Sequence, residues 1–446
     1  MYNLVTTLAA VVVVLGFLVL IHEFGHYAMA KLFKVRVEVF SIGFGKRLLG
    51  FTRGDTDYRI SALPFGGYVR MTGENPLEAH SDDPAAFMNH PRWQRFVIAI
   101  AGPFMNVALA VTLLTVVYMV RYEHPYFLDQ PAVIGWVMEN SAAEKSGFEA
   151  GDRIVRINSK QNPTWEDVEA TVLLNPGQPV DVGVERNGQF LDKSIVPEKA
   201  GTEDYGRVAG WIPKEPNLVT EIEADKPAAK AGMKVGDEVV AADGQAMGSM
   251  QALIHFLQQN QGKPVDVTVL RDGQTVHLNI TPVLDTKTEK PQWRLGFRSA
   301  PTHVDKLNFA QAVNRSLDSN KRYSLLIFEL VKKLAERKVS MKQIDGPIGI
   351  ARASGEAARQ EGWTPLLALM AAISLNLGIF NMFPIPIMDG GVILLLGIES
   401  LMRRDISIRI KERIYQAAFV FLILFAAIVI YNDLGKALPG LAKFLP

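Results

Sequence analysis

Four stretches of this sequence carry no charged residue and are long enough to cross a lipid bilayer. They cover residues 1–21, 96–120, 363–388 and 414–432. A helix needs about 20 predominantly apolar residues to span the hydrocarbon core, and each stretch is close to that length or longer. The chain is therefore expected to be a polytopic α-helical membrane protein with four transmembrane helices.

The first stretch has two interpretations, a cleaved signal peptide or a retained span. It has no basic residue before its apolar part and no clear cleavage site of small residues. Its apolar pattern also runs directly into His22 and Glu23. We therefore expect a span that stays in the mature protein.

Lysine and arginine are unevenly distributed between these spans. Ten of them lie between the first two spans, at positions 31–95, and five lie between the last two, at positions 403–413. None precedes the first span. Because basic residues accumulate in cytoplasmic loops, both loops are expected in the cytoplasm, which places both termini and residues 122–362 on the other side.

Composition limits the kinds of site that the chain can build. The 446 residues include no cysteine, so disulfides and Cys-based zinc sites are excluded. Any metal must be bound by His, Asp, Glu or Asn. The net charge of +1 gives no reason to expect a nucleic-acid partner.

His22, Glu23 and His26 form the pattern H-E-x-x-H at the end of the first stretch. Positions i and i+4 share a helix face, so both imidazoles can bind one metal ion. Zinc lowers the pKa of a bound water to about 7, and the glutamate beside it can accept the proton. Ionisable residues at membrane depth cost at least about 2.5 kcal/mol each and are usually functional. The alternative is that these residues lie at the membrane interface.

Two histidines leave a catalytic zinc site incomplete, because such sites usually have three protein ligands. Asp389 is the other acidic residue within strongly apolar sequence, after two prolines and before two glycines. These residues are expected to break the third span near its cytoplasmic end, where an unwound segment can turn a carboxylate toward a metal. The predicted topology puts Asp389 and His26 on the same side, so we predict one Zn²⁺ bound by His22, His26 and Asp389.

The segment between the second and third spans contains an internal repeat with an offset of 85 residues. Nine residues beginning at Gly147 recur from Gly232 without a gap. Each copy combines short alternating strands, Asn-Gly or Asp-Gly turns and a helix, which predicts two α+β domains. The expected domains are 1–121 (membrane region with a β-hairpin loop), 122–205 and 206–300 (the two copies), 301–362 (amphipathic helical linker) and 363–446 (second membrane region).

The pattern A-x-x-x-G-x-x-x-G-D in both copies resembles the PDZ family in its bacterial protease form. This resemblance implies domains that add an extended peptide as a strand and bind its C-terminal carboxylate on backbone N–H groups. Gly210, Trp211 and Ile212 are the candidate carboxylate-binding loop of the second copy. Alternatively, Gly210 only makes a turn and the domains act as spacers.

H-E-F-G-H in the first span and N-x-x-P-x-P-x-x-D-G in the third resemble the site-2 protease family of intramembrane metalloproteases. The motifs Ala-Gly-Pro-x-x-Asn at 101–106 and Gly-Pro-x-Gly at 346–349 support this resemblance, which covers nearly the whole chain. It implies a zinc metalloendopeptidase of the bacterial inner membrane that cleaves single-span proteins within the bilayer, with Glu23 as catalytic base. It further implies the second cut in regulated proteolysis of an anti-sigma factor during envelope stress, and cleavage of remnant signal peptides.

Asn376 and Asn381 are polar residues in the apolar third stretch. Either can donate a hydrogen bond to substrate backbone or to the developing oxyanion. Alternatively, they bond the backbone groups freed by the nearby prolines. The family resemblance favours substrate binding.

The first cytoplasmic loop alternates in character from Val35 to Phe40 and continues into Gly43, Phe44 and Gly45. This period of two predicts β-hairpins rather than a helix. We hypothesise that Gly43-Phe44-Gly45 and its hairpin hold an unwound substrate by strand addition, sheltered at the membrane. The alternative is an ordinary surface hairpin.

Two other functional classes fit parts of the sequence. A membrane scaffold would use the two repeat domains but would leave the four ionisable residues without a role. A transporter would use intramembrane His and Asp residues, but it predicts repeated membrane halves, and the spans show no repeat.

Overall fold

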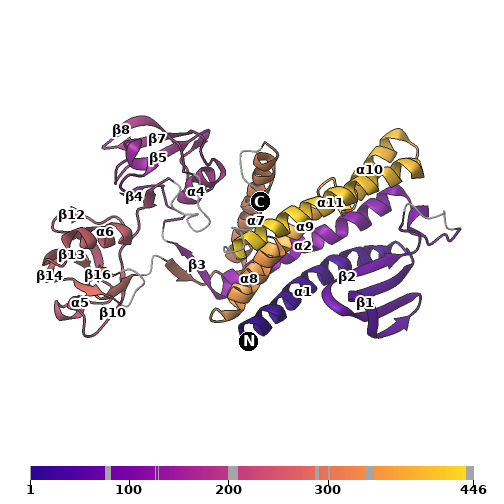
Figure 1. The fold of residues 1–446 in the computed structure, drawn as a ribbon, viewed down its shortest axis with the longest axis horizontal. Helices are drawn as coiled ribbons and strands as arrows, with labels where there is room; N and C mark the ends of the chain where they lie inside the picture. The colour runs from indigo at the N-terminus through magenta and orange to yellow at the C-terminus, as the bar shows by residue number, and fades with distance from the viewer. Residues whose placement is uncertain are drawn as a thin grey trace. The chain divides into compact units, whose positions relative to one another are not determined.

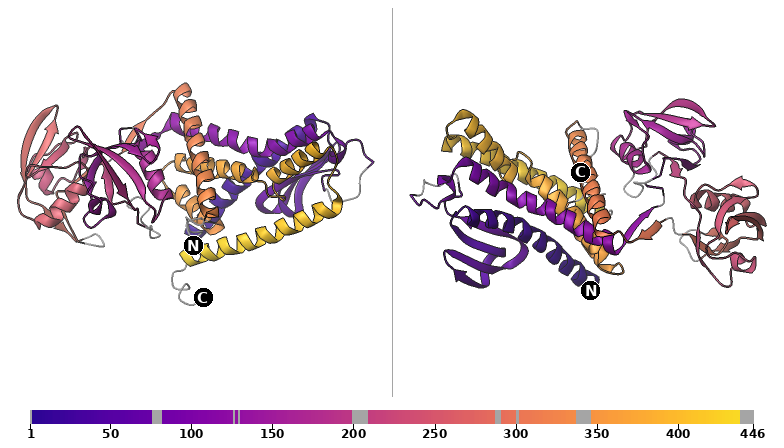
Figure 2. Two further views of the ribbon diagram at one scale, coloured as in Figure 1. Left: turned by 90° about the horizontal axis from the view of Figure 1, so that it is seen from above. Right: turned by 180° about the vertical axis from the view of Figure 1, so that it is seen from behind.

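A computed structural model describes residues 2–75, 82–125, 127–128, 130–198, 209–286, 291–299, 302–336 and 346–437 (Figures 1 and 2). The chain forms two compact units. The membrane unit comprises Met1–Arg121, Lys306–Phe328 and Ser340–Pro446. The repeat unit comprises Tyr122–Asp305 and Glu329–Val339.

Among the described residues, four helices of the membrane unit are long and apolar enough to cross a membrane, which confirms the predicted number. They are α1 (Tyr2–Leu32), α2 (Arg92–Val120), α9 (Thr364–Asn381) and α11 (Ile408–Ala437). The third apolar stretch is helical only to Asn381, and α10 (Asp389–Met402) begins after seven residues without helix. Pro384 and Pro386 lie in this interruption, where proline prevents helix continuation.

α2 lies between α1 and α9 and packs against both helices (Figure 1). Val14, Leu18 and Met370 form a buried apolar cluster in this part of the unit. The hydroxyl of Ser374 donates a hydrogen bond of 2.8 Å to the carbonyl of Asn106 and so links α9 to α2. Apolar side chains pack about as well against lipid as against another helix, so polar contacts of this kind help to select one helix as the packing partner.

The segment expected as an amphipathic linker contains α7 (Phe309–Ala335) and α8 (Pro347–Arg359). The start of α8 is capped by Asp433 of α11, a residue that is only 2% exposed. Its carboxylate accepts hydrogen bonds from the backbone N–H groups of Gly346 at 3.0 Å and Ile348 at 2.9 Å. A carboxylate at a helix N-terminus satisfies free donors and complements the helix dipole, so this contact anchors one end of α11.

The loop between the first two spans forms a sheet of two long antiparallel strands, β1 (Val37–Arg53) and β2 (Thr56–Met71), as the alternation predicted. Both strands fold back on themselves. Residues 39–42 pair with 57–60 on one side and with 67–70 on the other. Among the described residues, the outer part of β1, near 47–53, and the end of β2, near 67–71, pair with a strand on one side only and form the two edges of the sheet.

The repeat unit contains two four-stranded antiparallel sheets of the same topology. Their orders are β6-β5-β7-β8 and β12-β11-β13-β14. The strands are β5 (Arg153–Ile157), β6 (Lys160–Gln161), β7 (Val180–Arg186), β8 (Gln189–Ile195), β11 (Glu238–Ala242), β12 (Gln245–Ala246), β13 (Val265–Arg271) and β14 (Gln274–Ile280). Each sheet has its own helix, α4 (Trp165–Leu174) or α6 (Met250–Asn260), and its own apolar core. The sequence repeat thus corresponds to a structural repeat.

The predicted carboxylate-binding loop lies in the first copy, not in the second. β9 (Trp211–Pro213) pairs with β4 (Ile134–Val137), and Trp211 packs in the first apolar core. The expected boundary between residues 205 and 206 lies outside the described residues, but residues 209–213 belong to the earlier domain. The prediction went wrong because the closing strand of this domain comes after its second hairpin and after a long connection.

The matching loop of the second copy is Leu295-Gly296-Phe297. Gly210 accepts a hydrogen bond from the N–H of Met138, and Gly296 accepts the equivalent bond from Glu223. Both glycines have positive φ, +82° and +90°, and a Cβ on either would overlap a neighbouring side chain. This second loop was not predicted from the sequence because the two loops share only the glycine and a following aromatic residue.

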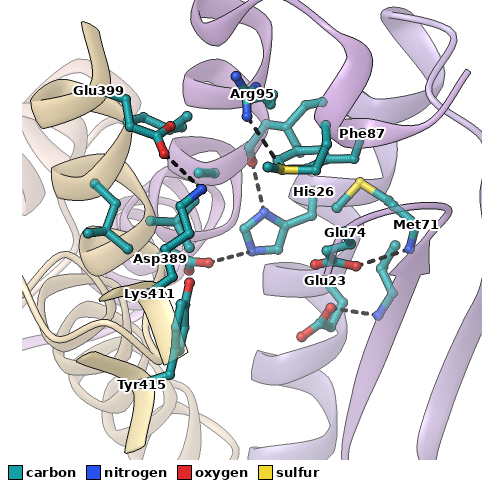
Figure 3. A pocket seen from close by; sticks show the side chains of 17 residues that line it. Glu23, His26, Met71, Glu74, Phe87, Arg95, Asp389, Glu399, Lys411 and Tyr415 are labelled. Atoms are coloured by element: carbon teal, nitrogen blue, oxygen red, sulfur yellow. Dashed lines mark hydrogen bonds and ion pairs between the residues drawn. The ribbon is translucent and has the colours of Figure 1, made fainter. Parts of the chain in front are cut away.

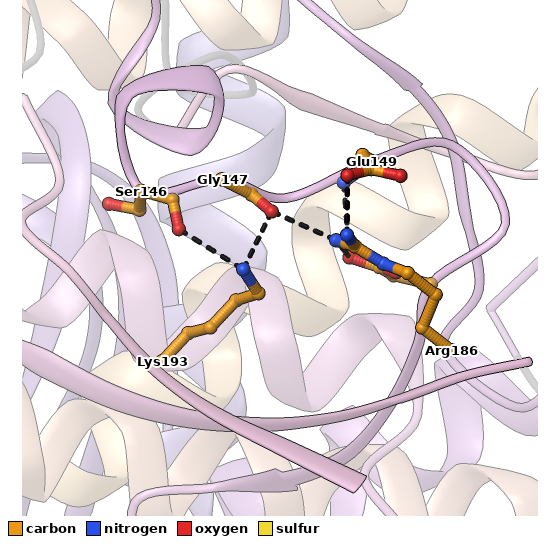
Figure 4. A network of polar contacts seen from close by, with 6 residues as sticks. Ser146, Gly147, Glu149, Arg186 and Lys193 are labelled. Carbon is orange, nitrogen blue, oxygen red and sulfur yellow. Dashed lines mark hydrogen bonds and ion pairs between the residues drawn. The ribbon is translucent and has the colours of Figure 1, made fainter. Parts of the chain in front are cut away.

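An arginine–aspartate pair recurs in both copies. Arg186 Nε donates to Asp152 at 2.6 Å, and Arg271 Nε donates to Asp237 at 2.7 Å. Figure 4 shows that Arg186 also reaches Glu149 and the carbonyl of Gly147. Each buried aspartate also accepts a backbone N–H, so the pair ties the last residue of β7 or β13 to the loop before β5 or β11.

Replacing Asp237 with Asn should destabilise the second copy in a pH-dependent way. The hydrogen bond from Arg271 lowers the pKa of Asp237. A carboxylate whose pKa is lower in the folded than in the unfolded protein stabilises the fold at pH values above its unfolded-state pKa of about 3.9. This stabilisation is lost as the pH falls through the folded-state pKa. Near pH 7 we expect a midpoint lower by about 4–8 °C, and the difference should shrink below about pH 4. Hydrogen exchange of β13 measured against temperature checks this.

Asp272→Asn is the matched control, since Asp272 is an exposed turn residue next to the same arginine. It should leave the midpoint unchanged at every pH. An equal loss in both variants, or a loss for Asp237→Asn that does not depend on pH, would contradict the assignment to the ion pair.

Candidate metal centre

His22, Glu23 and His26 lie on α1, and its helical geometry brings the two imidazoles together. His22 is 7% exposed and His26 is 9% exposed. Their Nε2 atoms lie 3.2 Å apart. Two ring nitrogens this close in a buried site can serve a shared cation, as the i,i+4 spacing predicted.

Two glycines let α2 approach this face of α1. A Cβ on Gly25 would lie 2.4 Å from the carbonyl oxygen of Ala101, and a Cβ on Gly102 would lie 2.3 Å from His26 Nε2. Neither distance is compatible with a side chain. Small residues at a helix crossing allow close backbone packing within a membrane. The Gly102 position therefore leaves the metal-binding edges of both rings uncovered.

Asp389 completes the group, as the topology argument predicted. Its Oδ2 lies 3.1 Å from His22 Nε2, and its Oδ1 lies 3.4 Å from His26 Nε2. The three ligand atoms all lie within 4.8 Å of one another. The two glycines after Asp389 make this position possible, because a Cβ on Gly390 or Gly391 would lie 2.2 Å from a backbone carbonyl oxygen in the interruption.

The polar atoms around this group fit a metal site. Asp389 Oδ2 is buried and faces His22 Nε2 at 3.1 Å. His26 Nδ1 lies 2.8 Å from the carbonyl oxygen of Ile98, which only a protonated Nδ1 can bond. This contact fixes the tautomer that leaves the Nε2 lone pair free for a cation. Two imidazoles and a carboxylate are a ligand set that zinc prefers.

Asn106 of α2 belongs to the site although its sequence position did not predict this role. It is fully buried, and its Nδ2 lies 3.1 Å from His22 Nδ1. Its Oδ1 has no partner among the described residues. If the side-chain amide is flipped by exchanging its O and N atoms, Asn106 Oδ1 would accept a hydrogen bond from the Nδ1–H group of His22. The lone pair of His22 Nε2 would then be free for a cation, as in His26. The sequence feature that could have pointed to Asn106 is that it is the single asparagine in the second apolar stretch, residues 96–120.

Glu23 lines a cavity of about 110 Å³ together with His26 and Asp389 (Figure 3). Its Oε2 accepts a hydrogen bond of 2.9 Å from the backbone N–H of Val69 in β2. The end of β2 therefore lies directly beside the predicted catalytic base. This end of β2 is one of the two sheet edges described above.

The other predicted site residues lie elsewhere. Asn376 is exposed and Asn381 is half-buried at the end of α9, and neither is among the residues that line this cavity. Gly43 and Phe44 lie in β1, and Phe44 stacks on Tyr68 with ring centroids 6.0 Å apart. Residues 39–42, just before them, are paired on both sides, and Phe44 pairs with Leu63 of β2. The role of Gly43, Phe44 and Gly45 in holding substrate stays a prediction.

Comparison with known families is consistent with this geometry. The sequence profile described as Peptidase family M50 matches residues 10–425, a range that includes both histidines, Glu23 and Asp389. The chain belongs to peptidase family M50. The resemblance to site-2 proteases is therefore confirmed, and this family M50 member is a zinc metalloprotease of the site-2 type.

Named relatives of this family M50 chain are similar over almost their whole length. Regulator of sigma-E protease RseP of Salmonella typhimurium is 30% identical over 98% of this chain and 100% of its own. Protease RseP of Yersinia pestis has the same identity and coverage. Among solved structures, the PDZ domain of the SdrC-like protein of Listeria monocytogenes is 21% identical and covers 20% of this chain and 90% of its own, with a TM-score of 0.18, too low to assign the fold.

Substituting Gly102 with Ala should abolish metal binding while leaving the helices intact. The added methyl group would occupy the space in front of His26 Nε2 and push α2 or the ring away. We expect zinc content to fall at least about tenfold, as for other changes that displace a ligand. Metal analysis of the purified protein checks this.

Gly397→Ala is the matched control, because a Cβ at this helical position of α10 meets no atom within 4 Å. It should retain full zinc content. Zinc content that stays normal in Gly102→Ala would contradict the close approach of the two helices.

Proposed function

We propose that this chain is an intramembrane endopeptidase whose catalytic centre consists of His22, Glu23, His26 and Asp389. The observation that carries the proposal is the convergence of three ligand atoms within 4.8 Å, from two buried histidines and the half-buried Asp389, beside a glutamate that lines the same cavity. α1, which carries three of these residues, is itself apolar and long enough to cross a membrane. A single Zn²⁺ held by His22, His26 and Asp389 would supply an acidified water and polarise the scissile carbonyl.

Glu23 is the proposed general base. Its carboxylate accepts a proton from the attacking water as the water oxygen bonds to the carbonyl carbon. It then donates this proton to the leaving amine as the C–N bond breaks, which yields one new carboxylate and one new amine. The hydrogen bond from Val69 N–H holds Oε2 and leaves the second carboxylate oxygen free for this transfer.

The end of β2 is the proposed binding edge for unwound substrate. A transmembrane helix must lose its internal hydrogen bonds before cleavage, and its freed backbone groups then need partners. Residues 67–71 pair with β1 on one side, and the N–H groups of Val69 and Met71 donate to the Glu23 and Glu74 carboxylates. A substrate strand paired along this edge would pass the catalytic base and would compete for these two donors. This keeps the predicted strand addition and extends it from Gly43-Phe44-Gly45 to the next strand of the same sheet.

The names of the relatives suggest the biological setting. The Salmonella typhimurium relative is named regulator of sigma-E protease RseP. We propose the same class of role for this chain. The chain would make the second cut in a single-span anti-sigma factor during envelope stress, and would also cleave signal-peptide remnants. The two repeat domains would act as PDZ domains that recognise peptide C-termini through the loops at Gly210 and Gly296.

The proposed location is the bacterial inner membrane, with the repeat domains and both termini in the periplasm. The distribution of Lys and Arg supports this orientation, because the loops that carry the basic residues are short and adjoin the spans. His26 and Asp389 then lie toward the cytoplasmic side. Asn376 and Asn381 remain proposed substrate contacts at the end of α9.

Glu23→Gln should abolish cleavage of a single-span model substrate while zinc stays bound. We expect the rate to fall about 100- to 10,000-fold, because proton transfer is lost and the ligands are intact. Cleavage by purified protein and zinc analysis of the same samples check this, with a chelator-treated sample alongside. The exposed Glu412→Gln serves as the control for loss of a carboxylate. Normal turnover by the Glu23→Gln protein would exclude Glu23 as the base.

Cysteine crosslinking should detect the substrate strand at residues 67–71. The chain has no cysteine of its own, so Arg70→Cys in the Glu23→Gln background gives a single reactive site. A series of single-cysteine substrates should crosslink with a period of two if the substrate is extended, and of three to four if it is helical. Leu49→Cys on the opposite edge of the sheet is the control and should not crosslink. Crosslinking at Leu49→Cys alone would contradict the proposed edge.

A further inference from the structure

Glu399 of α10 and Lys411 of α11 form an ion pair inside the membrane unit. Lys411 Nζ lies 2.7 Å from Glu399 Oε1, and the two side chains are 7% and 1% exposed, respectively. The same Oε1 accepts a hydrogen bond of 3.1 Å from the backbone N–H of Ile406. The carboxylate therefore has two donors in a site that is nearly closed to water.

A buried ion pair is a poor means of gaining stability. The cost of removing both charges from water offsets most of their attraction, and two apolar residues of similar volume often do as well. Removing one partner is different, because the remaining charge stays buried without compensation. The best-attested use of such a pair is to select one packing arrangement among several. This points to a role in fixing how α10 and α11 pack.

The pair lines the same cavity as the metal-binding group. Figure 3 shows Glu399 and Lys411 on one side of this cavity and Glu23 and His26 on the other, with Asp389 between them. Asp389 is the first residue of α10, and Glu399 lies ten residues further along the same helix, or about 15 Å along its axis. A displacement of α10 at Glu399 is therefore carried by the helix to the third ligand.

α11 is otherwise weakly attached. None of the side chains from Phe419 to Ile428 is buried. Its buried polar residues lie at its two ends, where Lys411 bonds to α10 and Asp433 caps α8. α11 supplies none of the three ligands. Among the described residues, Lys411 and Tyr415 of α11 both line the cavity beside Asp389, and Lys411 is the one that forms an ion pair with α10.

We propose that Glu399 and Lys411 are a positioning pair for the metal centre. The pair holds α10 in the position that places the Asp389 oxygens beside His22 and His26. It thereby makes the geometry of the ligands depend on how α11 is seated. Neither side chain touches the reacting atoms. The inference rests on the proposed site at His22, His26 and Asp389.

Zinc affinity is the direct test, measured by competition with a chromogenic chelator on the purified full-length protein. Lys411→Met and Glu399→Gln should each weaken zinc binding about 10- to 100-fold, the usual effect of losing a residue that supports a ligand. The double variant should recover most of the affinity, because it removes both charges of the pair together and leaves neither partner uncompensated. Lys411→Arg keeps the charge and should stay close to wild type. In single turnover, the single variants should lose cleavage rate with little change in substrate affinity.

Arg92→Gln is the matched control. Arg92 pairs with Asp405 at 2.7 Å, but the two side chains are 32% and 59% exposed, so the loss of this pair should not affect zinc binding. Wild-type zinc affinity in Lys411→Met would overturn the proposal. So would a double variant as weak as the single variants, because that result would assign both residues to packing alone.

The proposed metal site and the proposed positioning role are contradicted by different results. If His22→Ala binds zinc as tightly as the wild type, the site itself is wrong, whatever the result at Lys411. If His22→Ala loses zinc and Lys411→Met does not, only the positioning role is overturned.

Discussion

The close approach of α1 and α2 is the contact on which the metal-binding group depends. Gly25 and Gly102 allow it, because a methyl group at either position would overlap the other helix. Once the helices are this close, α2 can offer the carbonyl of Ile98 to one imidazole and the amide of Asn106 to the other. The same contact that packs the two apolar helices therefore also sets the orientation of the ligand rings.

Buried polar contacts fix the rest of the membrane unit. Apolar side chains pack almost as well against lipid as against protein, so they do not select one arrangement of helices by themselves. In this unit Ser374 bonds to α2, Asp433 caps α8 and Glu399 binds Lys411. Each of these contacts joins a different pair of elements. Together they leave Asp389, which begins α10, facing the two histidines of α1.

The two units were predictable to different degrees. The four helices and the strands of the first loop followed from the length of apolar stretches and from a period of two, both of which are local signals. The two repeat domains followed from the offset of 85 residues, which also relates Arg186 and Asp152 to Arg271 and Asp237. The loop at Gly210 was assigned to the wrong copy, because strand pairing with β4 over a long connection leaves no trace in adjacent residues.

The sequence by itself determined the ligand types, their spacing on α1 and the interruption before Asp389, because histidines at i and i+4 and prolines before glycines act through local backbone geometry. Only the tertiary structure decided which elements surround the ligands. Asn106, the sheet edge near Val69 and the pair of Glu399 with Lys411 each depend on segments far apart in the chain. Their roles follow from close packing between helices and strands, which no single segment encodes.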